Sequence, residues 1–567
     1  MAGLAADSAA GPAVGASGEE DTAMEPYRRP GIDDRPDYEK ALSAEDKASL
    51  ARLASEDRRL PPEASAAQPG AQSARLAADG VSAVAAAAVD AAVPDYASSF
   101  MDMRDPMVSA DGRRPSASDM LRLKWALLLG ALLSVAPWTT LTMIALPNQV
   151  ARVHGFDTAS DALASQDAAA LAAPLAWTVA IGALFAVLFT PFVSTISDHT
   201  RLPVGRRTPW LVGGGLLSAL FALALGATNA SVLVGLLWVL LQCTYAMVAA
   251  PLAAAIAERV PDKFRDETER WHAIGVLAGQ LAGGVAGGLS IAFGAFDPFL
   301  CAAVMFALSG VVVVLVWPRE ASSSSQPLVR FAWGQVGAAL RPPLGRGTRA
   351  FHTLYASRLF MSAAAGTTGA FLWYVVRFAV YGDMPRFTSA PVTLPAGTLL
   401  SLLAVASFAG ALLATCCGGM ITDKFAEGFG AWWRGSRSAV ALACALYALG
   451  LCLGLAIVLY GGEKSLTAFS FVAGFAAGMY DVLVQPLVVD ALPDPRSAGR
   501  DLGVYATARP LGLALGTAAG AWSATELGDW THPLSAGAFG YMAVFPAGIV
   551  CVALAVLCVA LTPKRGA

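Results

Sequence analysis

Two ionisable side chains lie deep within apolar segments, where they could bind a solute or carry a proton. Asp481 lies nine residues before Asp490 and Arg509 lies eight residues after Asp501, so a rise of about 1.5 Å per helical residue places both at similar depth. A charge inside a bilayer costs at least about 2.5–3.5 kcal/mol, so each needs a partner or a task. We predict that they face each other or a shared cavity, as a static ion pair, as a proton-linked switch with Asp481 as the coupling group, or as part of a substrate site.

Aromatic and amide side chains in the other apolar segments suit a sugar-like ligand, because rings stack on sugar faces and amides both donate and accept hydrogen bonds. Each of these side chains also fits simple packing between helices. Gln242 and Gln280 are the stronger candidates, since an amide in hydrocarbon needs a hydrogen-bond partner. The candidate substrate-binding residues are Trp138, Gln242, Tyr245, Gln280, Trp373, Tyr480 and Arg509.

The elements that hold these side chains must cross a membrane, because the chain is too poor in charge to cover a soluble surface. Of its 567 residues, 56% are hydrophobic and 14% are charged, whereas a soluble domain has about 25% charged residues. The net charge of -3 argues against a nucleic-acid partner, which needs a basic patch. The 8 cysteines stand in apolar runs without metal-ligand spacing, and the segments lack HExxH and GxSxG motifs, so we expect no metal site, no cofactor and no enzyme activity.

Residues 1–120 differ sharply in composition from the rest of the chain. They are rich in Ala, Ser, Pro and charged residues, so they cannot bury enough apolar surface to offset the entropy of ordering, and we predict a disordered cytoplasmic tail. Beyond them, apolar segments of about 20 residues recur, each long enough to cross roughly 30 Å of hydrocarbon. We predict an all-α polytopic membrane protein with twelve transmembrane helices, at about 124–146, 173–196, 209–227, 231–257, 272–294, 297–317, 353–380, 394–421, 438–460, 466–490, 502–524 and 537–562.

Lys and Arg in the loops orient these helices, because cytoplasmic loops carry an excess of positive charge. With both termini placed in the cytoplasm, the inner loops hold nineteen Lys and Arg residues and the outer loops hold three. An error in the number of helices would have mixed the two sets, so the contrast supports both the orientation and the count. Arg358 and Arg377, near the two ends of one segment, are expected to extend to the lipid headgroups.

A polar linker at about 318–350 divides the body into two similar halves, 121–317 and 351–567. Glycines four residues apart share one helix face and allow two backbones to approach closely. Such glycines recur in the fifth and eleventh segments, and a shift of 233 superimposes Gly279, Gly283 and Gly287 on Gly512, Gly516 and Gly520. We predict two pseudo-symmetric six-helix bundles with a substrate site at their interface.

The loop between the second and third segments has an acid followed by a Gly-Arg-Arg triplet, and residues 197–210 read SDHTRLPVGRRTPW. This loop resembles the signature loop of the major facilitator superfamily. Its spacing and trailing Pro-Trp are similar to the sucrose-transporter and glycoside–pentoside–hexuronide branches. A partial copy begins before Asp423, and residues 490–503, DALPDPRSAGRDLG, resemble the matching loop of those branches. The sequence departs from the family pattern at Ser194, where Gly is usual, and at His199, where Arg is usual.

The resemblance implies two bundles that expose a central site alternately to the two sides of the membrane. An acid at a cytoplasmic helix end can lie against the positive N-terminus of a neighbouring helix, and arginines can bridge to acids or carbonyls of the other half. We therefore predict an inner gate, with arginines that merely set the topology as the alternative. Its candidate residues are Asp198, Arg206, Arg207, Asp423, Asp494 and Arg496.

The expected function is secondary transport of a small polar solute, a sugar or glycoside by resemblance, across the cytoplasmic membrane of a bacterium. The first half has no carboxylate clearly within a span, so a proton coupled through Asp481 is the candidate ion, and facilitated diffusion stays open. Efflux of a drug or metabolite is the alternative within transport. A non-transporting membrane receptor or interaction protein is the alternative class. The expected partners are the solute, a proton and the lipid bilayer, with the chain as a monomer.

Overall fold

The computed structural model describes helices and loops within one unit of the chain, Asp105–Ala567. The described residues are 108–109, 114–156, 169–294, 296–320, 322–324, 333–344, 348–381, 393–427, 436–456, 462–492, 498–527 and 539–563. The predicted tail lies almost wholly outside them. All regular structure in these ranges is helical, and none of the described residues is in a strand.

The first half contains six long helical segments. Ser116 begins the first of them, because its hydroxyl accepts the backbone N–H of Asp119 at 3.2 Å and the Asp119 carboxylate accepts the N–H of Ser116 in return. The segment continues through α5 (Ala117–Thr140), a π-helical turn η1 (Leu141–Ala145) and α6 (Leu146–Val153). The others are α8 (Ala172–His199), α9 (Thr208–Ala227), α10 (Ser231–Arg259), η2 (Asp262–Phe264) with α11 (Arg265–Phe293), and α12 (Pro298–Val316).

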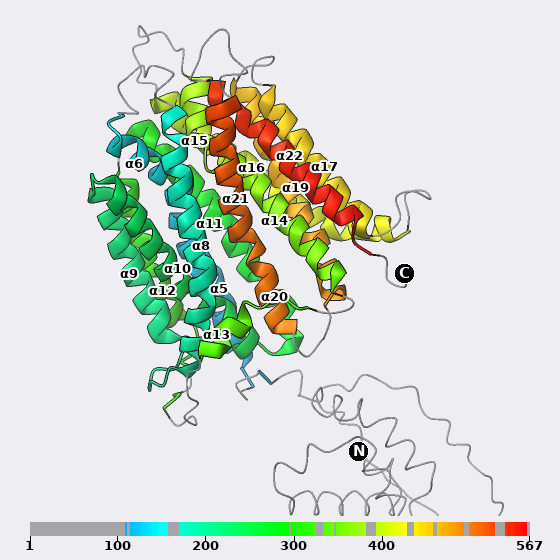
Figure 1. Ribbon diagram of the computed structural model, residues 1–567. Coiled ribbons are helices and arrows are strands. Elements are labelled where there is room, and N and C mark those ends of the chain that lie inside the picture. Colours follow the sequence, from blue (N-terminus) through cyan, green and yellow to red (C-terminus); the bar gives the residue numbers. More distant parts are fainter. Residues whose placement is uncertain are drawn as a thin grey trace, which may run out of the picture. The chain divides into compact units, whose positions relative to one another are not determined.

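The second half follows a short linker helix, α13 (Trp333–Ala339). In Figure 1, α9, α10 and α12 lie on one side of the body and α17, α19 and α22 on the other. The elements of the second half are α14 (Arg349–Gly369) with α15 (Leu372–Tyr374) and the π-helical η3 (Val375–Val380), α16 (Thr393–Glu427), α17 (Ser436–Leu455), α19 (Gly462–Asp490), α20 (Ala498–Ala506), α21 (Ala508–Trp522) with η5 (Ser523–Leu527), and η6 (Phe539–Ala543) with α22 (Val544–Ala560).

Eleven helices among the described residues are long and apolar enough to cross a membrane, each at the place of a predicted span. The remaining predicted span, the eleventh along the chain, is divided at Thr507 into α20 and α21. Pro510 lacks the N–H that would donate to the carbonyl of Ala506, and the N–H of Thr507 donates to Val504 at 3.0 Å in a tighter turn. The predicted fold class is confirmed, with one of the twelve segments broken.

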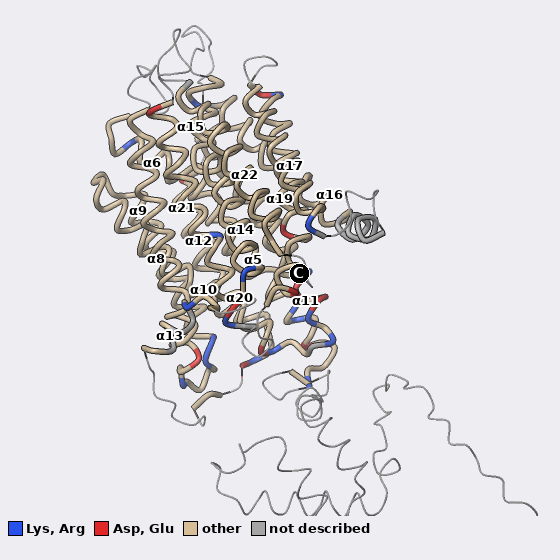
Figure 2. Tube along the Cα trace, turned by 45° about the vertical axis from the view of Figure 1, so that its right-hand side comes forward, with Lys and Arg blue, Asp and Glu red and all other residues tan. Residues whose placement is uncertain are grey.

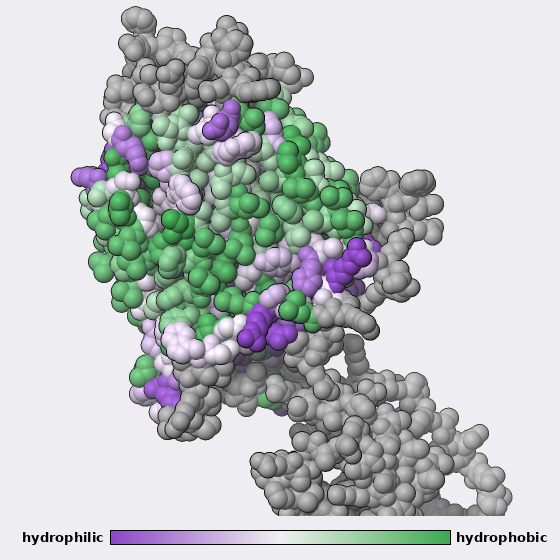
Figure 3. Space-filling model, in the orientation of Figure 1, coloured by the Kyte–Doolittle hydropathy of each residue, from purple (hydrophilic) through white to green (hydrophobic). Residues whose placement is uncertain are grey.

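Charge and hydrophobicity are arranged along the helices as a bilayer requires. On the face in Figure 3, hydrophobic side chains cover the middle of the body and hydrophilic ones lie nearer its ends. Figure 2 shows charged residues gathered mainly at the end near α13, with a few inside the body. We call the charged end the inner end and the opposite end the outer end. Large apolar side chains such as Trp177 and Val550, which are 69% and 60% exposed, cover the helices between them.

The predicted glycine stripes pack against equivalent helices in the two halves. α11 lies on α5 at Gly283, where a Cβ would collide with the carbonyl oxygen of Ala136, and α21 lies on α14 at Gly516, where a Cβ would collide with that of Ala363. The same relation holds one turn earlier, at Gly279 on the carbonyl of Leu132 and at Gly512 on that of Leu359. One turn later, Gly287 and Gly520 lie closest to the side chains of Ile144 and Phe371. The repeat is therefore a repeat of packing as well as of sequence.

The halves meet along α11 and α16, and along α8 and α21. Gly284 and Gly288 form a second face of α11, where a Cβ on the first would crowd Ala404 and a Cβ on the second would collide with Ser401 of α16. The hydroxyl of Ser401 also donates to the carbonyl of Val285 at 3.1 Å. α11 is therefore held by its backbone on two sides, within its own half and across the interface.

The outer ends of the two halves are in direct contact. The phenol of Tyr374 in α15 donates a hydrogen bond to the carbonyl of Pro147 in α6 at 2.8 Å, and the tyrosine is fully buried. α6 and α15 lie near each other at one end of the body in Figure 1. This contact closes the outer side at the point where the first segments of the two halves meet.

Candidate functional site

An ion pair lies at mid-depth in the second half. Arg358 of α14 binds the carboxylate of Asp481 of α19 through Nη1, and its guanidinium lies 5.8 Å from the ring centroid of Tyr480. The Tyr480 and Ser357 hydroxyls are 3.0 Å apart, and both side chains are buried. The prediction that Arg358 extends to the headgroups is therefore wrong, because a carboxylate at the same depth holds it inside the protein.

Arg509 faces the first half of the molecule. It is exposed, and its charge acts on the phenol of Tyr245 in α10. Within the described part of the chain, no hydrogen bond or ion pair joins its guanidinium to another side chain. The expected pairing of Asp481 with Arg509 is not formed, since Asp481 binds Arg358. Residue counting gave the two groups a similar depth, but depth does not specify which neighbouring helix a side chain faces.

Stacked aromatic rings lie in the first half. Trp138 of α5 is stacked on Tyr245, with ring centroids 4.4 Å apart and planes at 20°, and on Trp238, at 5.3 Å and 23°. Trp238 is fully buried, whereas Trp138 and Tyr245 are partly exposed. The structure thus brings two predicted site residues, Trp138 and Tyr245, into contact.

The two glutamines differ in their surroundings. Gln280 lies one helical turn before Gly284 on the face of α11 that packs against α16, and it is exposed. It therefore faces the second half, on the inner side of the tight contact. Gln242 lies three residues before Tyr245 and is 6% exposed, and no described residue makes a hydrogen bond with its amide. Gln280 thus lies on a helix that packs against the second half, whereas Gln242 lies on α10, which packs mainly against helices of its own half.

Two of the predicted site residues are buried inside the second half. Trp373 is 0% exposed, and its indole N–H has no hydrogen-bond partner among the described residues. Tyr480 is 1% exposed and bonded to Ser357. In this structure neither residue reaches the interface where Trp138 and Tyr245 lie.

Arg207 is the centre of the inner loop between α8 and α9. It is 3% exposed, binds Glu258 of α10 and Asp198 of α8, and donates to the Ser197 hydroxyl at 2.8 Å. Arg206 binds Glu258 at 3.0 Å. Burial alone would lower the pKa of Arg207, but hydrogen bonds and charges of Glu258 and Asp198 outweigh it and raise the pKa above its ordinary value. The raised pKa keeps the guanidinium of Arg207 charged at physiological pH.

All of these contacts lie within the first half. The expected bridge from Arg206 or Arg207 to the second half is not formed among the described residues, because both arginines are turned to Glu258. Asp423 lies on α16, but its side chain is outside the described residues, as are Asp494 and Arg496. The gate positions of the second half therefore stay predictions.

Glu320, which sequence reasoning missed, closes the N-terminus of α9. Its carboxylate accepts hydrogen bonds from the backbone N–H groups of Arg206, Arg207 and Thr208 at 3.0–3.1 Å. Gly205 has φ +100°, and a Cβ there would collide with the carboxylate, so the glycine of the triplet supplies both the backbone angle and the room. An acid from beyond α12 thus binds the positive end of α9. Its only sign in the sequence is an isolated acid shortly after the sixth span.

The segment after α12 lies along the same inner loop. The hydroxyl of Ser323 accepts the N–H of Leu202 at 3.0 Å and donates to the carbonyl of Thr200 at 3.1 Å. The guanidinium of Arg259 lies 4.4 Å from the ring centroid of Trp317, where α12 ends. The beginning of the linker is therefore attached to the first half.

Arg377 is buried, contrary to the prediction that it extends to the headgroups. It is 6% exposed and lies in the π-helical η3, with its guanidinium 5.7 Å from the ring centroid of Phe378. π-helical turns shift the direction of side chains relative to an α-helix, so a position counted on the α period is misplaced. Just beyond, the phenol of Tyr381 donates to Glu463 of α19 at 2.5 Å. The outer end of this segment is thereby attached to its own half.

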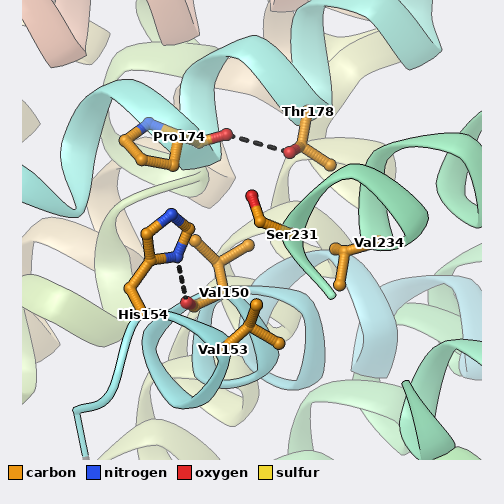
Figure 4. Close-up of a pocket in the computed structure, with 7 residues that line it drawn as sticks. All are labelled: Val150, Val153, His154, Pro174, Thr178, Ser231 and Val234. Carbon is orange, nitrogen blue, oxygen red and sulfur yellow. Dashed lines mark hydrogen bonds between the residues drawn. The ribbon is translucent and has the colours of Figure 1, made fainter. Parts of the chain in front are cut away.

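A shallow pocket lies at the outer end of the first half (Figure 4). It contains about 190 Å³, part of it open to solvent. The His154 ring lies 2.8 Å from the carbonyl of Val150, and the Thr178 hydroxyl donates to Pro174 at 2.9 Å, so these polar groups are already bonded within their own helices. Within the described part of the chain, no group of three or more His, Cys, Asp or Glu side chains could hold a metal ion. The lining residues are Val150, Val153, His154, Pro174, Thr178, Ser231 and Val234.

Two bundles with the same internal packing and polar residues of both at their interface define a polytopic membrane transport protein. The chain belongs to the Major Facilitator Superfamily, whose family model matches residues 127–426. The predicted family is confirmed. No curated protein sequence matches the chain significantly.

Solved transporters share the fold at low sequence identity. A mutant of the nucleoside transporter NupG is 12% identical, with a TM-score of 0.56 over 78% of this chain and 100% of that one. A bacterial homologue of the human lysosomal transporter Spinster, inward-facing and occupied, is 15% identical, with a TM-score of 0.53 over 79% and 96%. A D-xylose-proton symporter is 16% identical, with a TM-score of 0.52 over 77% and 97%. At these identities the similarity establishes the fold alone.

Proposed function

We propose that this protein is a secondary transporter that moves a small polar solute, a sugar or glycoside, across the cytoplasmic membrane of a bacterium by alternating access. The observation that carries the proposal is that the rings of Trp138 and Tyr245 stack in the first half, while Arg509 lies on α21, the helix of the second half that packs against α8. Aromatic faces and hydrogen-bond donors suit a polar ring, and a site shared by two halves changes whenever the halves move relative to each other. The nucleoside transporter and the D-xylose-proton symporter among the structural neighbours are named for solutes with such rings.

We further propose that Asp481 couples transport to protons. Its side chain is 54% exposed while it binds Arg358, so water can reach the carboxylate without a change in the conformation of the protein. Protonation would remove the charge that holds Arg358, which is itself 17% exposed and beside Tyr480. We place the protein near the sucrose-transporter and glycoside–pentoside–hexuronide branches, as a monomer with both termini in the cytoplasm. The network of Arg207 and Asp198 serves as its inner gate.

The proposal is tested by exchange of radiolabelled hexoses, hexuronates, hexose phosphates, glycosides and nucleosides in proteoliposomes that contain the full chain. We expect saturable exchange of at least one of them, reduced at least tenfold by Trp138→Ala and Tyr245→Ala. Trp177→Ala is the matched control, because Trp177 is exposed on the apolar surface. Absence of exchange for every solute contradicts transport of this class, and exchange that survives both substitutions contradicts the site. If a proton gradient still drives solute uptake by the Asp481→Asn variant, Asp481 does not have the coupling role.

A further inference from the structure

The ionised side chains at mid-depth do not balance. With α20 and α21 counted as one membrane segment, the charged residues more than about two turns from either segment end are, among the described residues, Arg358, Asp481 and Arg509. Every other acid from Asp119 onward lies outside the spans or within about two turns of a span end. One carboxylate therefore faces two guanidinium groups, and Arg358 holds that carboxylate. The net charge at this depth is positive.

The uncompensated charge belongs to Arg509. No described side chain bonds to its guanidinium, and α21, which carries it, packs against α8 of the first half. A guanidinium far from the headgroups is costly unless a counter-charge or water accompanies it. The candidate site residues of the first half, Trp138, Gln242, Tyr245 and Gln280, include no acid. The described part of the protein thus presents a cation without a counter-ion at the interface where a solute would bind.

We infer that the transported solute is an organic anion, whose carboxylate or phosphate binds Arg509 while its ring or chain lies against Trp138 and Tyr245. This inference rests on the proposed function and names its substrate class. A guanidinium forms paired hydrogen bonds with carboxylate and phosphate, and the phenol of Tyr245 is a further donor beside it. The partly exposed side chains of Trp138 and Tyr245 supply the apolar contact for the remainder of the solute. A neutral sugar would leave Arg509 without a counter-charge in the loaded protein.

The test compares acids with their neutral counterparts by thermal unfolding of the purified full chain. The probes are nicotinate against nicotinamide and D-glucuronate against D-glucuronamide, with glucose 6-phosphate against glucose to distinguish phosphate from carboxylate. We expect at least one acid to raise the unfolding temperature while its neutral counterpart does not. Arg509→Gln should weaken the binding of that acid about tenfold to a hundredfold, which is the range expected for the loss of a charge-assisted hydrogen bond. Arg509→Lys should retain part of the effect.

Arg349→Gln is the control for loss of a positive charge, since Arg349 is exposed at the inner start of α14. The inference is overturned if acids and their neutral counterparts raise the unfolding temperature equally, or if no acid raises it. It is also overturned if an acid raises the unfolding temperature of Arg509→Gln as much as that of the original protein. Acids that bind but are not exchanged in proteoliposomes would refute the proposed transport function alone. Exchange of neutral solutes that survives Arg509→Gln would refute the inference alone.

A second readout needs no ligand. Removing one member of an ion pair destabilises a protein, whereas removing an exposed charge that has no partner changes its stability little. Arg509→Gln should therefore leave the unfolding temperature of the ligand-free protein nearly unchanged, and Arg358→Gln should lower it, because Asp481 would lose its partner. A fall for both variants would mean that Arg509 has a counter-charge within the protein, and the inference would be wrong.

Discussion

In the first half α11 rests on α5 through its glycines, and in the second half α21 rests on α14 through the equivalent glycines. The side chains that surround these two interfaces are not equivalent. The first half has stacked Trp138 and Tyr245 and, in its described ranges, no ionised group at mid-depth. The second half has Arg358, Asp481 and Arg509.

The difference shows which features a duplicated fold keeps. Backbone-to-backbone packing determines whether the helices assemble, so it is the same in both halves. Charge determines what the interface binds, and only one half needs to supply it. The inner loop shows the same division, since the network of Arg207, Glu258 and Glu320 is assembled entirely from the first half and the start of the linker.

The largest expected effect tests the equivalence of the two glycine interfaces. Gly283→Leu and Gly516→Leu place a side chain where a backbone carbonyl lies, and overpacking of this kind costs about 1–3 kcal/mol or more. Because neither backbone can retreat, we expect loss of monodisperse protein for both, measured by size-exclusion chromatography after solubilisation. Gly213→Leu is the control, since a Cβ at Gly213 meets nothing within 4 Å. Tolerance of one substitution but not the other would break the comparison.

The next effect concerns the charges that only the second half has. Asp481→Asn leaves Arg358 without its counter-charge. Breaking a buried pair costs about 3–5 kcal/mol, and the 54% exposure of Asp481 reduces the expected loss to about 1–2 kcal/mol. Thermal unfolding measures it. The double variant Arg358→Asp with Asp481→Arg should recover stability, and a double variant that stays as unstable as Asp481→Asn would show that the two residues are not a pair.

A smaller effect is expected at the inner loop. Glu320→Ala removes the carboxylate that binds the N-terminus of α9, and loss of a helix cap costs about 0.5–2 kcal/mol. We expect faster amide hydrogen exchange at residues 202–210. Asp297→Ala is the matched control, because Asp297 caps α12 at the outer end through the N–H of Phe299 at 2.8 Å. Equal exchange at the inner loop in both variants would mean that Glu320 does not hold it.

The smallest effect concerns the outer contact between the halves. Tyr374→Phe removes the hydrogen bond to Pro147, worth about 0.5–1.5 kcal/mol, and should favour opening by a few-fold to about tenfold. Hydrogen exchange should rise in α6 and η3. Tyr447→Phe, which removes a phenol bonded to Thr368 inside the second half, should leave both segments unchanged. A rise in exchange with Tyr447→Phe as well would mean that the effect is general loosening.

The sequence predicts the fold well because helix length and glycine spacing are periodic properties. Residues four apart share a helix face whatever surrounds them, so Gly283 and Gly516 could be assigned equivalent roles before any contact was known. Span positions follow in the same way from hydropathy. The break at Thr507 was less visible, because Pro510 stands in an otherwise continuous apolar segment.

The candidate site was predicted in part. Counting residues gave the depth of Asp481 and Arg509 but not the helix that each one faces, so the partner of Asp481 was assigned wrongly. The π-helical η3 moves Arg377 off the α period, and its burial has no sequence pattern. Glu320 acts on a helix more than a hundred residues away, and such a contact depends on how the chain folds back.

The two glycine faces of α11 have a consequence for the speed of motion. If the halves rock apart at the outer side, the contact of Gly283 with α5 persists while that of Gly288 with α16 separates. A surface of glycine and serine has no long side chains lodged in the opposite helix, so its separation needs no rotamer changes and exposes few apolar atoms. The barrier at this surface is then mainly the cost of wetting two smooth backbones. α11 would stay attached to α5 of its own half while its other face separates from α16.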